Sequence, residues 1–262
     1  MNPGIYLFCL TPASPLPEIA GMGIDGEHPL FVEVVGEVAA VLAEIHLKDF
    51  SGPKAKAKMA DLAWVAPRAL LHEEVVMAAL EQCPVLPVRF GTVFSSLAAA
   101  AEPLRRRQDV LKKFFQDTAG NQEWTLKGYV NLHQARARMM ASRMSAEQEQ
   151  LAGLSPGKRY FFEKKIKNAV DKATASWLKG IGKEIGKLAR ETSVGFSECR
   201  LQSRDVTGRG EEMIFHGALL VPDGSVGILE RMTDEWNKHH ESRSLQIELS
   251  GPWPLYHFAP AL

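Results

Sequence analysis

Three short apolar runs near the amino terminus predict β-strands. Residues 5–10 (IYLFCL) lie between Pro3-Gly4 and Thr11-Pro12, a boundary pattern typical of a buried strand. Residues 30–35 and 38–45 are two positions apart and predict an antiparallel hairpin, although the second run could instead open a helix. Residues 11–29 are rich in proline and glycine, so we expect an irregular loop there.

The next part of the chain predicts helix, strand and helix. Residues 69–82 carry apolar side chains at helical spacing and follow Pro67, which a first helical turn tolerates. Residues 85–90 form the next apolar run and predict a strand. A cap at Ser95 or Ser96 begins a helix that reaches about residue 118, and Pro103 is expected to kink or split it.

The second half of the chain predicts the order β-α-β-β-α-β. Its segments are a strand at residues 123–132, a polar helix at 135–151, an amphipathic helix at about 158–191, strands at 195–204 and 212–221, a helix at 226–240 and a strand at 245–249. This order is that of a ferredoxin-like split βαβ arrangement. The first half resembles the same plan with the first crossover helix replaced by the loop at residues 11–29 and a helix added at the end.

These patterns predict an α+β protein with two α/β domains. We expect a modified ferredoxin-like domain at residues 1–122. A ferredoxin-like domain at residues 123–262 would follow, with a long amphipathic helix and an extended carboxy-terminal tail. A chain of 262 residues with 45% hydrophobic content is long enough for two small cores.

Charge and cysteine content narrow the class of protein. Lys plus Arg and Asp plus Glu are equal at 31 each, so no overall positive field exists to attract nucleic acid or an anionic membrane. The three cysteines have no zinc-binding spacing and predict reduced side chains. The first apolar run is too short for a signal peptide or a membrane span, so we expect a cytoplasmic protein.

The stretch GMGIDG at residues 21–26 fits the G-x-G-x-x-G pattern of dinucleotide-binding turns. That pattern has this meaning only between a strand and a helix. Here the preceding strand candidate ends at Leu10, and Gly26 is followed by an extended apolar run rather than a capped helix. We therefore interpret the stretch as a glycine-rich turn and expect no nucleotide cofactor.

Other candidate motifs for chemistry are incomplete. HEEVV at residues 72–76 lacks the second histidine of a zinc-protease helix, so His72 reads as a surface or helix-start residue. GKEIGKL at 182–188 lacks the spacing and hydroxyl of a phosphate loop, and Gly180, Gly182 and Gly186 more readily serve close helix–sheet packing. The pair His239-His240 has no obvious third metal ligand. We expect no catalytic residue, no cofactor and no metal.

Two features leave alternatives open. Seven lysines of the long amphipathic helix could bind an acidic partner or a membrane surface, or they could form a solvated helix face. Arg89 ends an apolar strand candidate, where a buried guanidinium needs a carboxylate or carbonyl partner. For Arg89, structural pairing is favoured over the clamping of a substrate.

Seven motifs occur in one order along nearly the whole chain. They are GIDG at 23–26, VGEVAAVLAEI at 35–45, LAWVAPRALLHEEVV at 62–76, VLPVRFGTVF at 85–94, EWTLK at 123–127, GKRYFFEKK at 157–165 and SGPWPLYHF at 250–258. This series resembles the motifs of the gas vesicle protein F/L family. Leu255 stands where many members have a second proline, and the resemblance does not separate an F-like from an L-like member.

The resemblance implies a non-enzymatic accessory protein of gas vesicles. It implies as partners the small, apolar major wall subunit and other gas vesicle accessory proteins, with two α/β domains as the scaffold. We expect the protein to bind the wall subunit, shield its apolar surface and help to nucleate or extend the shell. Sheet edges and helix grooves are the natural docking sites, and the sequence does not choose between them.

Aromatic and arginine side chains are the usual anchors of protein interfaces. Arg89, Phe90, Trp253 and Tyr256 are therefore the candidates for partner-binding or domain-joining contacts. For Trp253 and Tyr256 a structural role is favoured, because prolines beside them hold the tail extended. An alternative function is a small-molecule-binding regulatory protein with tandem ferredoxin-like domains and Arg89 as its anion clamp.

Overall fold

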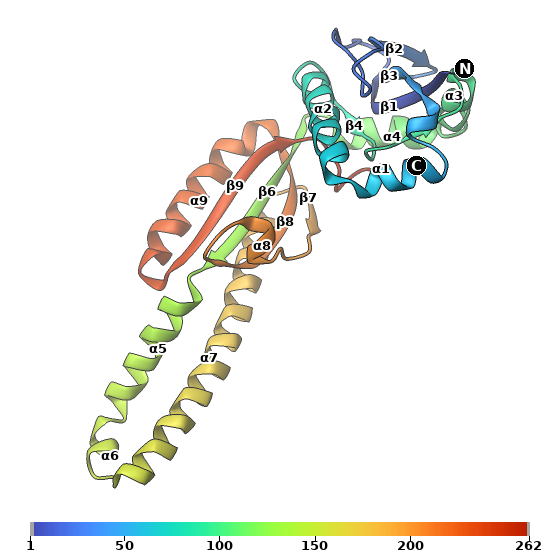
Figure 1. The fold of residues 1–262 in the computed structure, drawn as a ribbon. Coiled ribbons are helices and arrows are strands. Elements are labelled where there is room, and N and C mark those ends of the chain that lie inside the picture. The colour runs from blue at the N-terminus through green and yellow to red at the C-terminus, as the bar shows by residue number, and fades with distance from the viewer. Residues whose placement is uncertain (1–2, 261–262) are drawn as a thin grey trace. The chain divides into compact units, whose positions relative to one another are not determined.

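A computed structural model describes residues 3–260 and divides the chain into two compact units. One unit is the chain up to Gln122 together with the residues from Pro252 onward, and the other is Glu123–Gly251. Each unit contains one sheet with its own helices (Figure 1). The tail from Pro252 thus groups with the first unit, whereas the sequence analysis attaches it to the second domain.

The sheet of the first unit is built around its first strand. Its strands are β1 (Pro3–Pro12), β2 (Leu30–Val35), β3 (Val38–His46), β4 (Leu86–Pro87) and β5 (Val93–Phe94). Their order is β2-β3-β1-β4, and β5 pairs with β1 beyond the short β4. The run 38–45 is therefore a strand, which settles the alternative left open by the sequence. β1 is buried from Gly4 to Thr11, as expected of a continuous apolar run covered on both faces.

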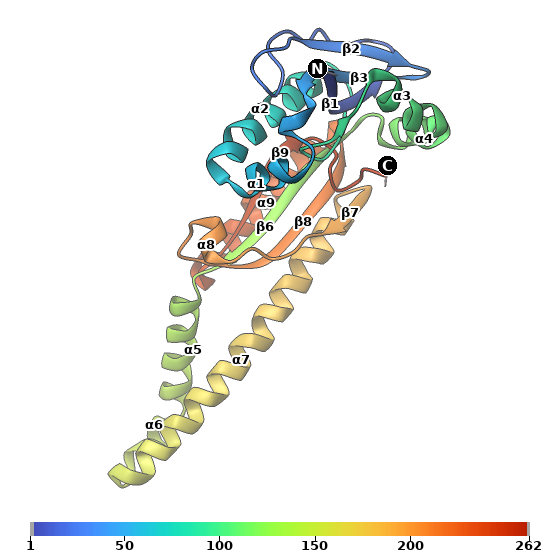
Figure 2. The same cartoon turned by 45° about the vertical axis from the view of Figure 1, so that its right-hand side comes forward.

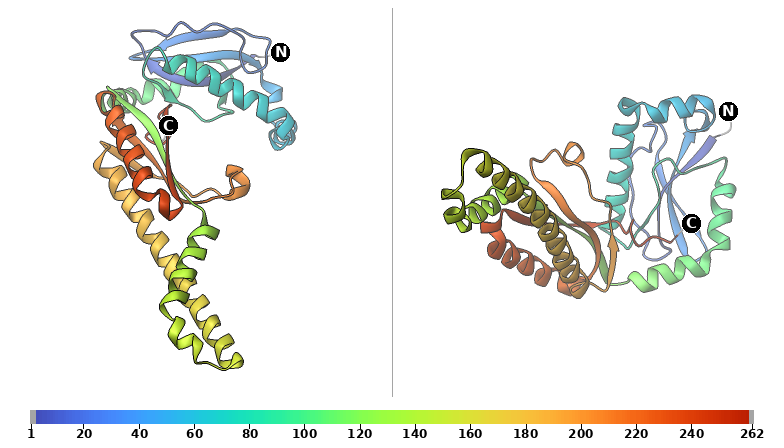
Figure 3. Two further views of the ribbon diagram at one scale, coloured as in Figure 1. Left: turned by 90° about the vertical axis from the view of Figure 1, so that its left-hand side faces the viewer. Right: turned by 90° about the horizontal axis from the view of Figure 1, so that it is seen from below.

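Helices lie on both faces of this first sheet (Figure 3). They are α1 (Pro53–Ala60), α2 (Leu62–Leu80), α3 (Leu97–Arg106) and α4 (Gln108–Thr118), with a short 3-10 turn η1 (Leu47–Asp49) after β3. On one face, α2 packs Val75, Val76 and Ala79 against Tyr6 and Phe8 of β1.

Local hydrogen bonds shift three predicted boundaries in this unit. α2 begins at Leu62 rather than residue 69, because the Asp61 carboxylate accepts the Ala63 amide and caps the helix there, leaving Pro67 inside it. The strand predicted at 85–90 is paired only at Leu86–Pro87, since proline removes ladder donors. Pro103 stays inside α3, and the predicted helix is divided instead after Arg106, where the backbone amide of Arg107 donates to the Leu104 carbonyl.

The second unit repeats the strand order of the first. Its strands are β6 (Asn121–Val130), β7 (Gly195–Glu198), β8 (Glu212–Pro222) and β9 (Leu245–Trp253), arranged β7-β8-β6-β9. The first sequential strand thus lies between the third and the fourth, with the second at the edge, which is the ferredoxin-like order. The first unit has this order as well, so the predicted fold class is confirmed for both sheets.

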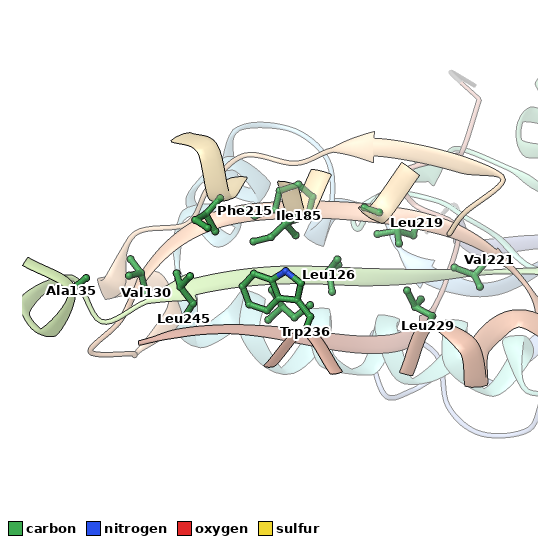
Figure 4. Packing of buried hydrophobic residues seen from close by; sticks show 13 residues of the cluster. Leu126, Val130, Ala135, Ile185, Phe215, Leu219, Val221, Leu229, Trp236 and Leu245 are labelled. Carbon is green, nitrogen blue, oxygen red and sulfur yellow. The ribbon is translucent and has the colours of Figure 1, made fainter. Parts of the chain in front are cut away.

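The remaining helices of the second unit are α5 (Leu132–Ala146), α6 (Gln148–Ala152), α7 (Pro156–Glu191), α8 (Arg204–Thr207) and α9 (Val226–His240), with 3-10 turns η2 (Asp223–Ser225) and η3 (Glu241–Arg243). The carboxy-terminal half of α7 packs Ile185 beside Leu126 and Phe215 of the sheet, and α9 adds Leu229 and Trp236 (Figure 4). This apolar layer is the core of the unit.

Two of the three glycines predicted to allow close helix–sheet packing do so. A Cβ at Gly182 would lie 3.2 Å from the Ile214 carbonyl oxygen, and one at Gly186 would lie 3.3 Å from the Phe215 ring. Gly180 faces open space, so the interpretation is wrong for that residue.

The amino-terminal half of α7 runs beyond the sheet and pairs with α5 and α6 as a helical hairpin (Figure 2). The two long helices meet through a small apolar seam. It contains the buried Leu151, Ile166 and Val170 with Met139, Met140, Met144, Leu154 and Phe162 beside them. Among the described residues we find no helix whose length and apolar character would let it span a bilayer.

Candidate partner-binding surfaces

The glycine-rich stretch at residues 21–26 is a pinned turn. The Asp25 carboxylate accepts the backbone amides of Glu27 and His28, and the Gly23 amide donates to the His28 carbonyl. Gly26 has φ +76°, a conformation that favours glycine, and Ile24 is buried beneath it. No helix opens from the turn, so the interpretation of this stretch as a glycine-rich turn is confirmed.

A buried hydrogen-bonded chain links β1, α2 and the loop after β4. His72 is only 2% exposed, and its Nε2 lies 3.2 Å from the Val88 carbonyl oxygen, which can only accept. Nε2 therefore carries the proton, and Nδ1 accepts from the Tyr6 hydroxyl at 3.0 Å. The Tyr6 oxygen in turn accepts the Gly91 amide at 3.0 Å. Burial lowers the pKa of His72 and raises that of Tyr6.

The prediction of a surface position for His72 is therefore wrong. The residue lies in the second half of α2, and Phe8 stacks on its ring at a centroid distance of 5.6 Å. The apolar stripe of the sequence gave no sign of it, because the partner that buries His72 lies 66 positions away. We assign this series of hydrogen bonds a structural role, because it holds the loop around Gly91 to the core.

Arg89 and Phe90 face different surroundings on that loop. Phe90 is half-buried and makes edge contacts with the rings of Tyr6 and His72. Arg89 is exposed, and its carbonyl accepts the amide and the hydroxyl of Thr92. Within residues 3–260 no ion pair is formed by the Arg89 guanidinium, so the expected structural pairing is not found.

The carboxy-terminal tail, which groups with the first unit, contains a buried leucine. Leu255 is 4% exposed, and the Tyr256 hydroxyl donates to the Glu73 carboxylate on α2 at 3.1 Å. Burial, reinforced by that carboxylate, raises the pKa of Tyr256. Trp253 is 40% exposed at the end of β9. The sequence pointed to the aromatic residues of this tail and missed its buried leucine.

The four candidate residues thus form no single site. Phe90 contacts His72 while Tyr256 contacts Glu73, so two of them meet consecutive positions of α2 within the first unit. Arg89 and Trp253 expose much of their surface instead. No sequence pattern predicted the cation–aromatic stack on α2, where the Arg68 guanidinium lies 4.2 Å from the centre of the Trp64 ring.

The lysines of the long helix are all exposed. They are Lys158, Lys164, Lys165, Lys167, Lys172, Lys179, Lys183 and Lys187. Of the ion pairs between described residues, one involves this set, from Lys187 to Glu191. The helical hairpin and the rest of α7, residues 132–191, contain thirteen Lys and Arg against six Asp and Glu, an excess of seven positive charges in a chain whose net charge is zero.

The histidine pair at the end of α9 forms no metal site. The His240 ring is buried on Trp236, with Nδ1 2.9 Å from the Trp236 carbonyl oxygen. Throughout the part of the chain that the structure describes, no three His, Cys, Asp or Glu side chains gather in a group able to hold a metal ion.

Comparison with known proteins gives matches along the full length of the chain. A model of the family described as "Gas vesicle synthesis protein GvpL/GvpF" matches residues 4–260. Gas vesicle protein L of Streptomyces sp. (strain CB03234) is 24% identical over 245 residues, which cover 93% of this chain and 87% of that protein.

Two crystal structures share the fold. The gas vesicle protein GvpF from Anabaena sp. PCC7120 superposes with a TM-score of 0.71 at 19% identity, covering 99% of both chains. GvpF from Microcystis aeruginosa superposes with a TM-score of 0.64 at 16% identity, covering 98% of this chain and 99% of that one.

Proposed function

The chain belongs to the gas vesicle synthesis protein GvpL/GvpF family, and we propose that it is an accessory protein which binds the small apolar wall subunit and assists nucleation or growth of the shell. The observation that carries the proposal is the family match across residues 4–260, which includes both units. An apolar wall subunit is prone to aggregate before assembly, so a partner that covers it would favour ordered growth. The proposed location is the cytoplasm and the gas vesicle, with other accessory proteins as further partners.

The structure offers several kinds of surface for such binding. β2 pairs only with β3 and lies at one edge of the first sheet, where a partner strand can be added. Exposed large apolar side chains occur in both units, among them Leu62 and Leu70 on α2 and Phe161 on α7. Arg89 and Trp253 are exposed residues of the types that anchor interfaces, and we retain both as proposed partner contacts.

The proposal is tested by co-expressing the full chain with the wall subunit and recovering the complex through a tag on this protein. We expect the wall subunit to be retained and kept soluble. In a vesicle-forming host, deletion of the gene should reduce or abolish vesicles, and the intact gene should restore them. Normal vesicles after deletion, together with no retained subunit, would overturn the proposal.

Single substitutions then separate partner contacts from structural ones. Arg89→Ala and Trp253→Ala are expected to fold normally and to weaken retention of the wall subunit. Lys179→Ala, which changes an exposed residue of α7, is the control. Unchanged retention in both variants would remove these residues from the proposed interface while leaving the test of the whole chain intact.

A further inference from the structure

The helical hairpin of α5, α6 and α7 has an open groove on each of its two faces. One groove is lined by Arg138, Met139, Ser142, Arg143, Ala146, Ala169, Val170 and Ala173 and encloses about 690 Å³. We call it the alanine groove. The other, of about 860 Å³, is lined by Arg136, Met140, Lys167, Asp171, Arg204 and Glu212 among others.

The two grooves differ in whether they contain acidic residues. In the second groove Arg136 lies 2.6 Å from Asp171 and Arg204 lies 3.1 Å from Glu212, and among the described residues Lys167 forms no ion pair. The alanine groove contains two arginines and no acidic residue. Arg143 pairs with Glu147 one turn along α5, and among the described residues Arg138 forms no ion pair. The alanine groove therefore carries positive charge that a partner can neutralise.

The floor of the alanine groove suits a helix. Ala146, Ala169 and Ala173 are exposed although they lie between two helices, so their small side chains let a third helix approach closely. Met139 and Val170 provide an apolar base, and the unbranched thioether of Met139 adapts to different partner side chains. A helix placed here would form a three-helix bundle with α5 and α7.

We propose that the alanine groove binds an amphipathic helix of a partner protein, whose apolar stripe packs on Ala146, Ala169 and Ala173 and whose acidic residues pair with Arg138. The excess of seven positive charges over residues 132–191 steers such an acidic segment toward the hairpin. A second copy of this groove is a poor occupant, because it would bring Arg138 and Arg143 against the same arginines. This inference goes beyond the proposed function, since it does not require the wall subunit to be the partner.

The test uses the full chain with a photo-crosslinking amino acid at Ala169, produced together with the other gas vesicle proteins of its host. The same amino acid at Ala175 is the matched control, because Ala175 is exposed on α7 and lines neither groove. We expect a crosslink from Ala169 to an acidic, helix-forming peptide of one gas vesicle protein, and little from Ala175. The wall subunit test and this one are separate readouts, so one can fail while the other succeeds.

Two kinds of variant probe the basis of the contact. Arg138→Glu combined with Arg143→Glu should lower the crosslink yield by about ten-fold, because attraction becomes repulsion. Ala173→Leu, which fills the groove, should lower it as well, whereas Ala175→Leu adds the same side chain outside the groove and should not. Circular dichroism melts are expected to match the parent, since all of these positions are exposed.

Four outcomes would overturn the inference. They are no crosslink from Ala169, equal crosslinks from Ala169 and Ala175, a crosslinked peptide from a second copy of this chain or without acidic residues, and a yield that charge reversal leaves unchanged.

Discussion

At the scale of single residues, the most demanding arrangement is the buried chain from Gly91 through Tyr6 and His72 to Val88. The Tyr6 hydroxyl and the His72 ring each make two hydrogen bonds, and these bonds join three segments of the first unit. Burying a polar group without a partner costs more free energy than one hydrogen bond contributes to stability. Loss of one of these hydrogen bonds therefore leaves a neighbouring polar group buried without a partner.

Tyr6→Phe is expected to destabilise the protein by about 1–3 kcal/mol, because the Nδ1 atom of His72 and the Gly91 amide lose their shared partner without gaining water. The free energy of unfolding in urea measures the change. Tyr160→Phe, at a residue that is 63% exposed, is the control and should leave stability within about 0.5 kcal/mol. Equal effects of the two substitutions would contradict this assignment.

The same series of hydrogen bonds predicts that the folded protein is less stable in acid. Burial lowers the pKa of His72 in the folded protein, so the unfolded chain binds the proton more readily. The contribution of neutral His72 to stability is therefore complete above the unfolded pKa of about 6.5 and is lost as the pH falls below it. Urea unfolding across this range checks the slope, and nitrogen NMR should find the proton on Nε2 of His72. A ring that titrates at its ordinary value would refute the prediction.

At the scale of elements, glycines mark where helices approach sheets. A Cβ added at Gly128 of β6 would lie 2.9 Å from Ile185 Cδ1 and 3.1 Å from Phe215 Cβ, so these two side chains would have to shift. Gly180 of α7 meets nothing within 4 Å. The sequence shows a glycine at both positions and does not indicate which of the two lies close to atoms of a neighbouring element.

The two glycines predict opposite effects of the same substitution. Gly128→Ala should destabilise the protein by about 1–3 kcal/mol through overpacking. Gly180→Ala should stabilise it by about 0.5–1 kcal/mol, because alanine is the better helix former and has room. Thermal and urea unfolding of both variants provide the comparison. A loss of stability in Gly180→Ala, or none in Gly128→Ala, would show that the packing differs from that described.

At the scale of the whole molecule, the carboxy-terminal tail returns to the unit that contains the amino terminus. Leu255 is buried and Tyr256 bonds to Glu73 of α2, 183 positions earlier. The first unit is therefore completed by the last residues of the chain.

Leu255→Ala is accordingly expected to lower the free energy of unfolding by about 2–5 kcal/mol, because removal of a buried leucine side chain leaves a cavity that the neighbouring residues do not fill. Leu70→Ala, at a position of α2 that is 66% exposed, should change stability by no more than about 0.5 kcal/mol. Hydrogen exchange should locate the loss of protection from Leu255→Ala in the first unit, in strands such as β1. Loss confined to the second unit would contradict the assignment of the tail.

The order of residues along the chain was enough to predict the local elements and the family. Hydrophobic periodicity depends on neighbours a few positions apart, so it predicted the β-α-β-β-α-β order of the second half, the modified form of this plan in the first half and the long helix. The prolines and glycines predicted the turn at residues 21–26. The ordered motifs pointed to the GvpL/GvpF family, and the match over residues 4–260 confirms it.

The way in which distant residues combine depends on the folded structure. It placed His72 in a core, left Arg89 exposed, buried Leu255 of the tail and formed two grooves on the helical hairpin, of which one is lined by two arginines and no acidic residue. These properties arise from contacts between residues far apart along the chain. The hydrophobic periodicity of a segment predicts which of its side chains are buried and which are exposed. It does not identify the distant residue that pairs with a charge or completes a hydrogen bond.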